Sequence, residues 1–205
     1  MIKAVIFDFD GTIADTLEEV IKILHEMAYK EFGKQKIEHF RGLTFHEMLN
    51  ELGIPFYKIP YFVKFGREKL AKKILEIRLH KHAKKLFENL ENRGYLTGII
   101  SSNSEANVRK FLKKNGVKEF DFIECGSTLF GKYFLLKRAI KRFGYSNDAV
   151  IYVGDEVRDI EAAHKAGIKI ISVSWGFNNA KLLKRYKPDF IANNCDDVLR
   201  VLEKL

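Results

Sequence analysis

The second half of the chain, from about residue 80, alternates helical patterns with short apolar runs. Four predicted helices, at 81–93, 105–115, 132–143 and 157–166, each end at a glycine or just before one, and each leads into a predicted strand, at 95–100, 121–125, 149–153 and 168–173. A last strand at 189–192 precedes a helix at 196–204. Glycine after a helical pattern is typical of a helix C-terminus. The alternation predicts an α/β fold with a doubly wound parallel sheet.

The first predicted strand, at 3–9, is separated from these elements by a region of a different kind. Apolar residues recur at helical spacing over 17–28, and helical patterns broken by glycine and proline continue to about residue 79 without strand alternation. We therefore predict an α/β core formed by 1–14 and 80–205, with an all-helical cap domain inserted at 15–79. Ligands of such sheets bind beyond the carboxyl ends of the strands, where this insertion leaves the core.

Composition excludes several classes of protein. Hydrophobic residues make up 46% of the 205 residues and no apolar run approaches the roughly 18 needed to cross a bilayer, so we expect no membrane partner. The first residues lack the pattern of a signal peptide, and we expect a cytoplasmic protein. Cys125 and Cys195 are too few and too far apart for a disulfide framework or a zinc site.

The net charge of +9 raises the question of a nucleic-acid partner. The lysines and arginines are scattered over predicted helices and interleaved with glutamates, without aromatic-studded basic strands. This pattern favours a solvated surface that attracts anionic substrates, and no nucleic-acid partner is expected.

The segment VIFDFDGTIADT at 5–16 places two acids at the end of the first predicted strand. Asp8 and Asp10 share one face of the strand because side chains alternate, and two partly buried carboxylates there repel each other. One interpretation is a simple Asp-Gly turn. The other is a site where a divalent cation screens both acids and one of them attacks an electrophile.

Other predicted strands are followed by polar residues that could serve the same chemistry. A purely structural role is the alternative for some of them. Asn103 or Ser104 would then simply cap a helix, and Asp155 and Asp159 would simply be acids that stabilise a first helical turn. Lys132, however, opposes the dipole at a helix start and needs an anionic neighbour. Together these residues provide the groups that phosphoryl transfer needs: acids to bind a metal, a carboxylate nucleophile, a general acid, and hydrogen-bond donors to the phosphate oxygens. The full set is Asp8, Asp10, Ser101, Ser102, Asn103, Lys132, Asp155 and Asp159.

Four motifs in this order resemble those of the haloacid dehalogenase superfamily, and within it the phosphoglycolate phosphatase-like group with a helical cap. They are DFDGT at 8–12, IISSN at 99–103, GK at 131–132 and GDEVRD at 154–159. The resemblance covers essentially the whole chain. Asp10 is absent from the dehalogenases of this superfamily, so the motif disfavours displacement of halide from carbon.

The resemblance implies a role for each motif residue. Asp8 is the expected nucleophile, which forms an aspartyl phosphate, and Asp10 the acid that protonates the leaving oxygen and then activates water. Mg²⁺ is the expected cofactor, held by Asp8, the backbone carbonyl of Asp10 and Asp155, with Asp159 supporting them. Lys132 is expected to contact the phosphate and Asp8. Ser102 and Asn103 are expected to donate hydrogen bonds to the phosphate, with Ser101 as the alternative to Ser102 for the hydroxyl.

Two segments depart from the family pattern. Glu156 stands where many relatives have serine, and LHKHAKK at 79–85 replaces a Pro-Gly where the cap returns to the core. These departures concern the surroundings of the metal and the hinge rather than the catalytic residues.

Substrate choice is expected to come from the cap, since the core motifs recognise only phosphate. Arg41, in FRGLTFHEML at 40–49, is the candidate contact for a carboxylate or second phosphate, with an ordinary surface arginine as the alternative. Five aromatic residues are predicted to form the small hydrophobic core of the cap. If they are exposed instead, the cap could form a homodimer or bind a protein partner through them. They are Phe56, Tyr57, Tyr61, Phe62 and Phe65.

The expected function is therefore a Mg²⁺-dependent phosphatase acting on a small phosphorylated metabolite. Phosphoglycolate is the first expectation, followed by sugar phosphates and pyrophosphate. A phosphomutase of the same superfamily is the nearest alternative, and a nucleic-acid-binding protein that kept the fold is a more distant one.

Overall fold

The core of the molecule is a parallel sheet of six strands, in the order β5-β4-β1-β6-β7-β8. The computed structural model describes residues 1–28, 32–126 and 131–205. The strands are β1 (Ala4–Asp8), β4 (Leu96–Ser101), β5 (Phe122–Cys125), β6 (Val150–Gly154), β7 (Lys169–Val173) and β8 (Phe190–Ala192). The predicted fold class is confirmed, and every predicted strand is present within two residues at each end.

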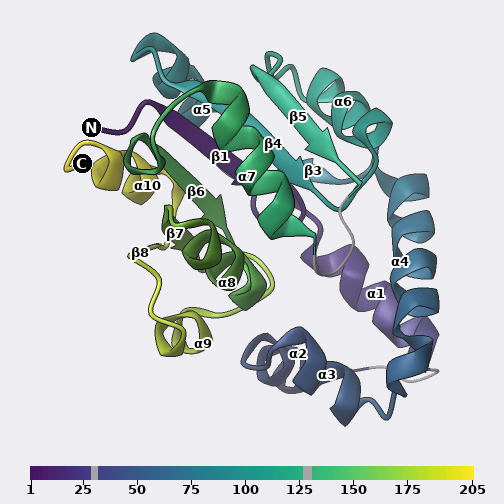
Figure 1. The fold of residues 1–205 in the computed structure, drawn as a ribbon. Coiled ribbons are helices and arrows are strands. Elements are labelled where there is room, and N and C mark those ends of the chain that lie inside the picture. Colours follow the sequence, from purple (N-terminus) through teal and green to yellow (C-terminus); the bar gives the residue numbers. More distant parts are fainter. Residues whose placement is uncertain (29–31, 127–130) are drawn as a thin grey trace.

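Helices cover both faces of this sheet (Figure 1). Side chains of α5 (Ala83–Asn92), α6 (Glu105–Lys114) and α10 (Cys195–Leu202) pack with Val5 and Phe7 on one face. Those of α7 (Lys132–Phe143), α8 (Val157–Ala166) and α9 (Ala180–Arg185) pack with Ala4 and Ile6 on the other. Since β1 is buried on both faces, its sequence is continuously apolar up to Asp8.

The glycines that follow the core helices end them as predicted. Gly144 and Gly167 follow α7 and α8 with φ of 69° and 73°, a left-handed conformation that glycine adopts without steric cost. Their amides donate to carbonyls of the last helical turn, for example Gly144 to Ile140. After Gly167 the chain enters β7 at Lys169, whereas after Gly144 a short 3-10 helix at Asn147–Ala149 precedes β6.

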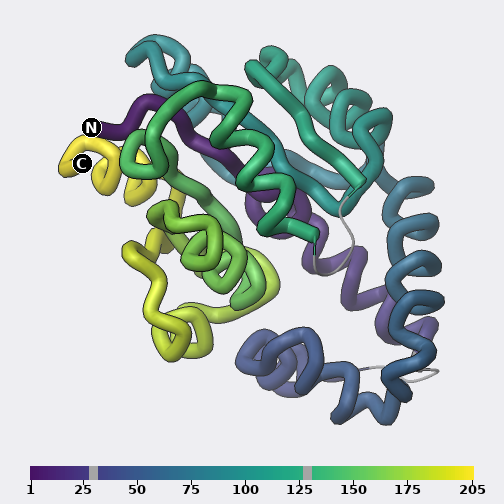
Figure 2. Tube along the Cα trace, in the orientation of Figure 1, coloured from purple at the N-terminus to yellow at the C-terminus, as the bar shows by residue number. Residues whose placement is uncertain are grey.

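Four helices form a separate layer over the carboxyl ends of the strands. They are α1 (Leu17–Ala28), α2 (Lys34–Arg41), α3 (Phe45–Glu51) and α4 (Ile59–Lys73), with a short 3-10 helix at Phe56–Lys58. Figure 2 shows this layer as one excursion of the chain, with α1 and α4 packed beside each other. All these elements lie within 15–79, the segment that we propose as the cap domain.

The base of this layer contains a feature that the sequence did not predict. Strands β2 (Ala14–Asp15) and β3 (Arg78–Leu79) pair antiparallel where the chain leaves and re-enters the core. Two residues are too short to produce a visible alternation of apolar and polar residues. His80 continues the connection, since its amide donates to the carbonyl of Ile13 at 2.9 Å.

The predicted aromatic core of the cap is only partly right. Phe62 packs against a small cluster of Leu49, Ile54 and Ile59, and Phe65 packs against the main core. Phe56, Tyr57 and Tyr61 are instead 73%, 77% and 66% exposed, so the prediction is wrong for these three. Short aliphatic residues fill the cap's small core, which leaves these rings on the solvent side.

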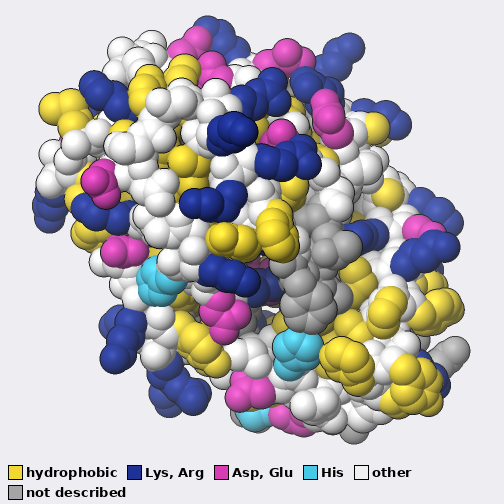
Figure 3. Space-filling view, viewed as in Figure 1, with side chains coloured by type: hydrophobic (Ala, Val, Ile, Leu, Met, Phe, Trp, Pro, Cys, Tyr) yellow, Lys and Arg dark blue, Asp and Glu magenta, His cyan; other side chains and the backbone are white. Residues whose placement is uncertain are grey.

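Figure 3 shows how charge is distributed over one face of the molecule. Lysine and arginine side chains are spread over this face with acidic side chains among them, while exposed hydrophobic side chains gather over the cap. Among the described residues, no helix has both the length and the apolar composition needed to span a lipid bilayer.

Candidate active site

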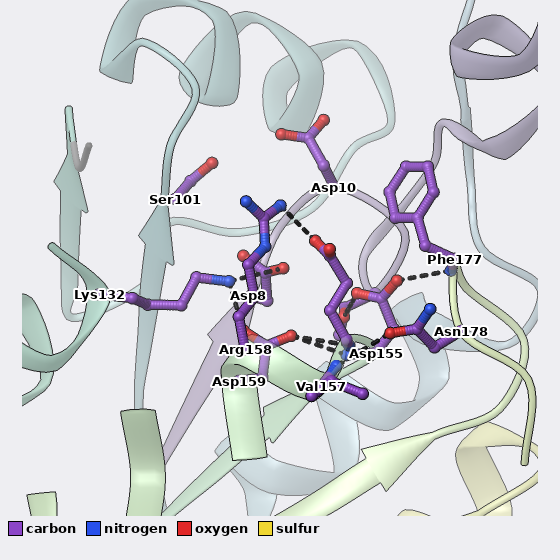
Figure 4. A network of polar contacts seen from close by, with 12 residues as sticks. Asp8, Asp10, Ser101, Lys132, Asp155, Val157, Arg158, Asp159, Phe177 and Asn178 are labelled. Atoms are coloured by element: carbon purple, nitrogen blue, oxygen red, sulfur yellow. Dashed lines mark hydrogen bonds and ion pairs between the residues drawn. The ribbon is translucent and has the colours of Figure 1, made fainter. Parts of the chain in front are cut away.

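The sequence motifs meet at one end of the sheet because β1 and β6 are adjacent parallel strands. Their register pairs Phe7 with Val153, which places Asp8 close to Asp155 just beyond β6. Asp159 lies on the first turn of α8 and Lys132 is the first residue of α7. Figure 4 shows these four side chains converging from four segments.

Three acids and one lysine form a buried cluster. One carboxylate oxygen from each of Asp8, Asp155 and Asp159 lies within 4.8 Å of the other two, and all three residues are buried. Lys132 Nζ lies 3.0 Å from Asp8 Oδ2 and also contacts Asp159 Oδ1. These two acids are the anionic neighbours that the position of Lys132 at a helix start requires.

Burial dominates the protonation of this cluster. It raises the pKa of Asp8 to about 7, against the opposing effect of Lys132, and raises that of Asp155 well above its ordinary range. For Lys132, burial acts to lower the pKa, but Asp159 and Asp8 outweigh it and hold the pKa above its usual value. Burial thus disfavours the ionised forms of Asp8 and Asp155, and the single lysine does not fully offset this effect.

Asp155 is held in place by groups from two other loops. Thr12 Oγ1 donates to its Oδ1 at 2.8 Å, and the Phe177 amide donates to its Oδ2 at 2.7 Å. A Cβ atom at Gly11 or Gly176 would lie 2.3 or 2.2 Å from Asp155 Oδ2, so only glycine fits at both positions. The carboxylate therefore has one orientation, set by the loops after β1 and β7.

Asp159 is oriented by backbone amides. Its Oδ2 accepts from the amides of Asp155 at 3.1 Å and Glu156 at 2.9 Å, while the Tyr152 hydroxyl donates to Oδ1 at 3.3 Å. Through these hydrogen bonds and its contact with Lys132, Asp159 fixes the position of the loop that carries Asp155.

The arrangement fits a divalent cation. Hard cations such as Mg²⁺ prefer carboxylate and carbonyl oxygens, and a bound cation keeps neighbouring carboxyl groups ionised. The residues described provide three converging carboxylates whose charge is only partly compensated by Lys132. A cation is the simplest group that would balance them.

Asp10 lies apart from the cluster, next to the second motif. Its Oδ2 accepts a long hydrogen bond of 3.5 Å from Asn103 Nδ2, and its Oδ1 is buried without a hydrogen-bond partner. Burial raises the pKa of Asp10 to about 6, although the Asn103 bond and Lys132 oppose this. A carboxyl group with one free oxygen and a raised pKa can donate or accept a proton near neutral pH.

The two candidate serines differ in access. Ser101 is fully buried and its Oγ accepts from the Asn103 amide at 2.9 Å, so it braces the loop. Ser102 is partly exposed and lines the same cavity as Asp10 and Asn103. The geometry favours Ser102 as the hydroxyl that a ligand can reach.

Arg41 has other partners than the expected substrate. Its Nη2 donates to the carbonyls of Ser174 at 2.9 Å and Gly176 at 3.1 Å, and its Nε also donates to Gly176. Its Nη1 pairs with Glu38 at 2.9 Å. Arg41 thus ties α2 to the loop that positions Asp155, and most of its donors are used there.

This contact predicts the effect of Arg41→Ala. We expect a loss of about 1 to 2 kcal/mol in the free energy of unfolding, because charge-assisted bonds to backbone carbonyls are removed. Denaturant titration measures it, with Arg200→Ala as the control, since Arg200 forms an exposed pair with Asp197. Unchanged stability together with a large rise in KM would instead identify Arg41 as a substrate contact.

Several residues of the site were not predicted from the sequence. Thr12 could have been found, because it follows Gly11 within the same motif. Arg158 could also have been found, because it lies within the GDEVRD motif; it contacts Glu156 and lies 5.5 Å from the centre of the Phe45 ring. The loop carrying Gly176 and Phe177 bears no comparable pattern.

The fold and the site define an α/β protein with a layer of helices over its strand ends and a buried cluster of acids and a lysine there. A model of the haloacid dehalogenase-like hydrolase family matches residues 5–173. The chain is 29% identical over 208 residues to a phosphoglycolate phosphatase from Synechococcus elongatus, covering 99% of this chain and 98% of that protein. It is 26% identical over 226 residues to the pyrophosphatase PpaX of Bacillus cereus, covering 100% and 98%.

The fold itself has close counterparts among solved structures. A haloacid dehalogenase-like family hydrolase from Streptococcus pneumoniae superposes with a TM-score of 0.78 at 23% identity, over 98% of both chains. The chain belongs to the haloacid dehalogenase-like hydrolase family. The predicted resemblance to its phosphoglycolate phosphatase-like group and the predicted enzyme class, a phosphatase of this family, are confirmed.

Proposed function

We propose that the chain is a Mg²⁺-dependent phosphatase that hydrolyses a small phosphomonoester through an aspartyl phosphate on Asp8. The observation that carries the proposal is the convergence of Asp8, Asp155 and Asp159 with Lys132 at the strand ends. Asp8, the Asp10 carbonyl and Asp155 would hold the cation, and Asp159 would support them. The bound cation would neutralise charge on the phosphoryl oxygens as the Asp8 carboxylate approaches.

The first step transfers the phosphoryl group to the protein. An oxygen of Asp8 attacks phosphorus, and the bond from phosphorus to the leaving oxygen breaks. Lys132, 3.0 Å from Asp8 Oδ2, reduces the repulsion between the carboxylate and the phosphate and orients the attacking group. Ser102 and Asn103, which line the same space as Asp10, would donate hydrogen bonds to the phosphoryl oxygens.

Asp10 acts as the general acid in the first step and as the general base in the second. In its protonated form it gives a proton to the leaving oxygen, which departs as an alcohol. The resulting carboxylate then accepts a proton from water as that water attacks phosphorus, and the bond between phosphorus and Asp8 breaks. Phosphate is released, Asp8 is regenerated and Asp10 is again protonated.

Asp10→Asn tests this role. We expect a fall in kcat of roughly 10²-fold or more, because asparagine can neither give nor take the proton. Under single-turnover conditions, release of the alcohol reports the first step and release of phosphate follows the second, so measuring both separates the two steps. A rate equal to wild type would exclude Asp10 as the general acid and base.

Substrates of the named relatives give the first compounds to test. A phosphate-release screen with Mg²⁺ would include phosphoglycolate, pyrophosphate and sugar phosphates. Release from at least one of them, lost in Asp8→Asn, supports the proposal. Absence of release from any phosphomonoester contradicts it.

A further inference from the structure

A cavity of about 210 Å³ lies between the cap and the strand ends. Asp10, Ser102 and Asn103 line it on the core side, so it is continuous with the proposed catalytic residues. The cap side is almost entirely apolar and draws on all four cap helices. Its lining includes Leu24, Met27, Phe40, Met48, Phe62 and Val63. We call this space the apolar chamber.

The apolar side chains that line the apolar chamber do not pack tightly enough against one another to fill it. Five of the residues that line it are only partly buried, which leaves their apolar side chains open to solvent in the space between the cap and the strand ends; they are Leu24, Met27, Met48, Phe62 and Val63. Apolar surface left in contact with water is unfavourable by about 25 cal/mol per Å², and a contiguous patch of it marks a binding site. A ligand with matching apolar surface would remove that cost.

Polar groups are confined to the end of the apolar chamber near the core. Arg158, Arg67 and Glu156 line it there together with Asp10. Burial and the nearby Arg158 lower the pKa of Arg67, while Asp10 acts to raise it, which places Arg67 on α4 close to both. A bound molecule would thus meet charge at its phosphate end and hydrocarbon at the other.

The size of the space limits what can occupy it. An apolar cavity of about 150 Å³ accommodates benzene, so about 210 Å³ accommodates one ring or a short alkyl chain. Glycolate has two carbons and ends in a carboxylate. Its carboxylate would therefore stay at the phosphate end, near Arg67 and Arg158, and the apolar lining contributed by the cap helices would gain no contact from it.

We propose that the apolar chamber binds the leaving group of the substrate, and that this leaving group carries an apolar body of about six carbons or one ring. The inference rests on the proposed function. It makes the cap lining, rather than Arg41, the main determinant of which phosphomonoester is hydrolysed.

The test is a series of n-alkyl phosphates from ethyl to hexyl, assayed with Mg²⁺ beside phosphoglycolate. The leaving alcohols have nearly the same basicity, so the chemical step is constant and only the buried area varies. We expect kcat/KM to rise about fourfold for each added methylene, and to exceed the value for phosphoglycolate at hexyl. A value that is flat along the series overturns the inference.

Gly66→Leu provides a variant that fills the apolar chamber. Gly66 lies on α4 and lines the space, and a Cβ atom there would meet Ile23 at an ordinary contact distance of 3.9 Å. Leucine is also a better helix former than glycine, so the fold should tolerate it. We expect the hexyl-to-ethyl ratio of kcat/KM to fall at least tenfold. Tyr57→Ala, at an exposed cap residue, should leave that ratio unchanged.

Binding of methyl- and hexylphosphonate, which are not hydrolysed, separates this inference from the proposed function. Calorimetry should show tighter binding of hexylphosphonate in wild type, with the difference reduced in Gly66→Leu. If no ester is hydrolysed but this difference is found, the proposed function fails and the chamber assignment is supported. If esters are hydrolysed and the two phosphonates bind equally, the chamber assignment fails alone.

Discussion

Asp8→Asn is expected to abolish turnover, by roughly 10⁴-fold or more, because an amide cannot accept the phosphoryl group as the carboxylate does. The protein should still fold. The substitution removes one negative charge from a buried cluster in which burial already raises the pKa of Asp8 to about 7. Lys132 keeps its contact with Asp159. Phosphate release and a thermal unfolding scan of the same sample measure both effects.

A matched control distinguishes loss of the nucleophile from a general effect of removing a carboxylate. Asp148 is exposed and lies just before β6, at the opposite end of the strand from Asp155. Asp148→Asn should therefore keep wild-type kcat. Substantial residual turnover in Asp8→Asn would exclude Asp8 as the nucleophile.

Removal of divalent metal should have an effect of similar size. We expect EDTA to abolish phosphate release and added Mg²⁺ to restore it. Without the cation, the Asp8 carboxylate and the phosphate would repel each other in a buried site. Mg²⁺ should also raise the Tm of the wild type, since a ligand that binds only the folded state stabilises it by about 2.7 kcal/mol at 100 times its Kd. This readout needs no substrate.

Asp155→Asn tests which residues hold the metal. We expect the Tm increase produced by Mg²⁺ to disappear and the Mg²⁺ concentration needed for activity to rise at least tenfold. Asp148→Asn should retain both responses. A metal-independent wild type, or an Asp155→Asn variant that responds to Mg²⁺ as the wild type does, would contradict the assignment.

The convergence of Asp8, Asp155 and Lys132 could be predicted because it follows from local rules. Each residue stands at a strand end or helix start that glycine and apolar patterning mark in the sequence. Parallel strands joined by crossovers bring their carboxyl ends to one edge of the sheet. The same patterning predicted the strands to within two residues.

Features that depend on contacts between distant segments were not predictable in this way. Arg41 bonds to carbonyls of Ser174 and Gly176, over 130 positions away in the chain, and nothing in the local sequence indicates those acceptors. The exposure of Phe56, Tyr57 and Tyr61 depends on how cap helices pack, as does the pairing of β2 with β3. Even a correct helix prediction leaves the orientation of each helix open.

The sequence by itself determined where the acids and the lysine of the proposed site stand, since their positions at element ends are encoded by short motifs with local turn and strand geometry. Only the tertiary structure decided how the Asp155 carboxylate is held between Gly11 and Gly176, and that side chains of the cap helices line an apolar space next to Asp10. The physical reason is that a cavity is a property of packing. Its volume and lining depend on the relative placement of side chains from all four cap helices, which no single stretch of sequence specifies.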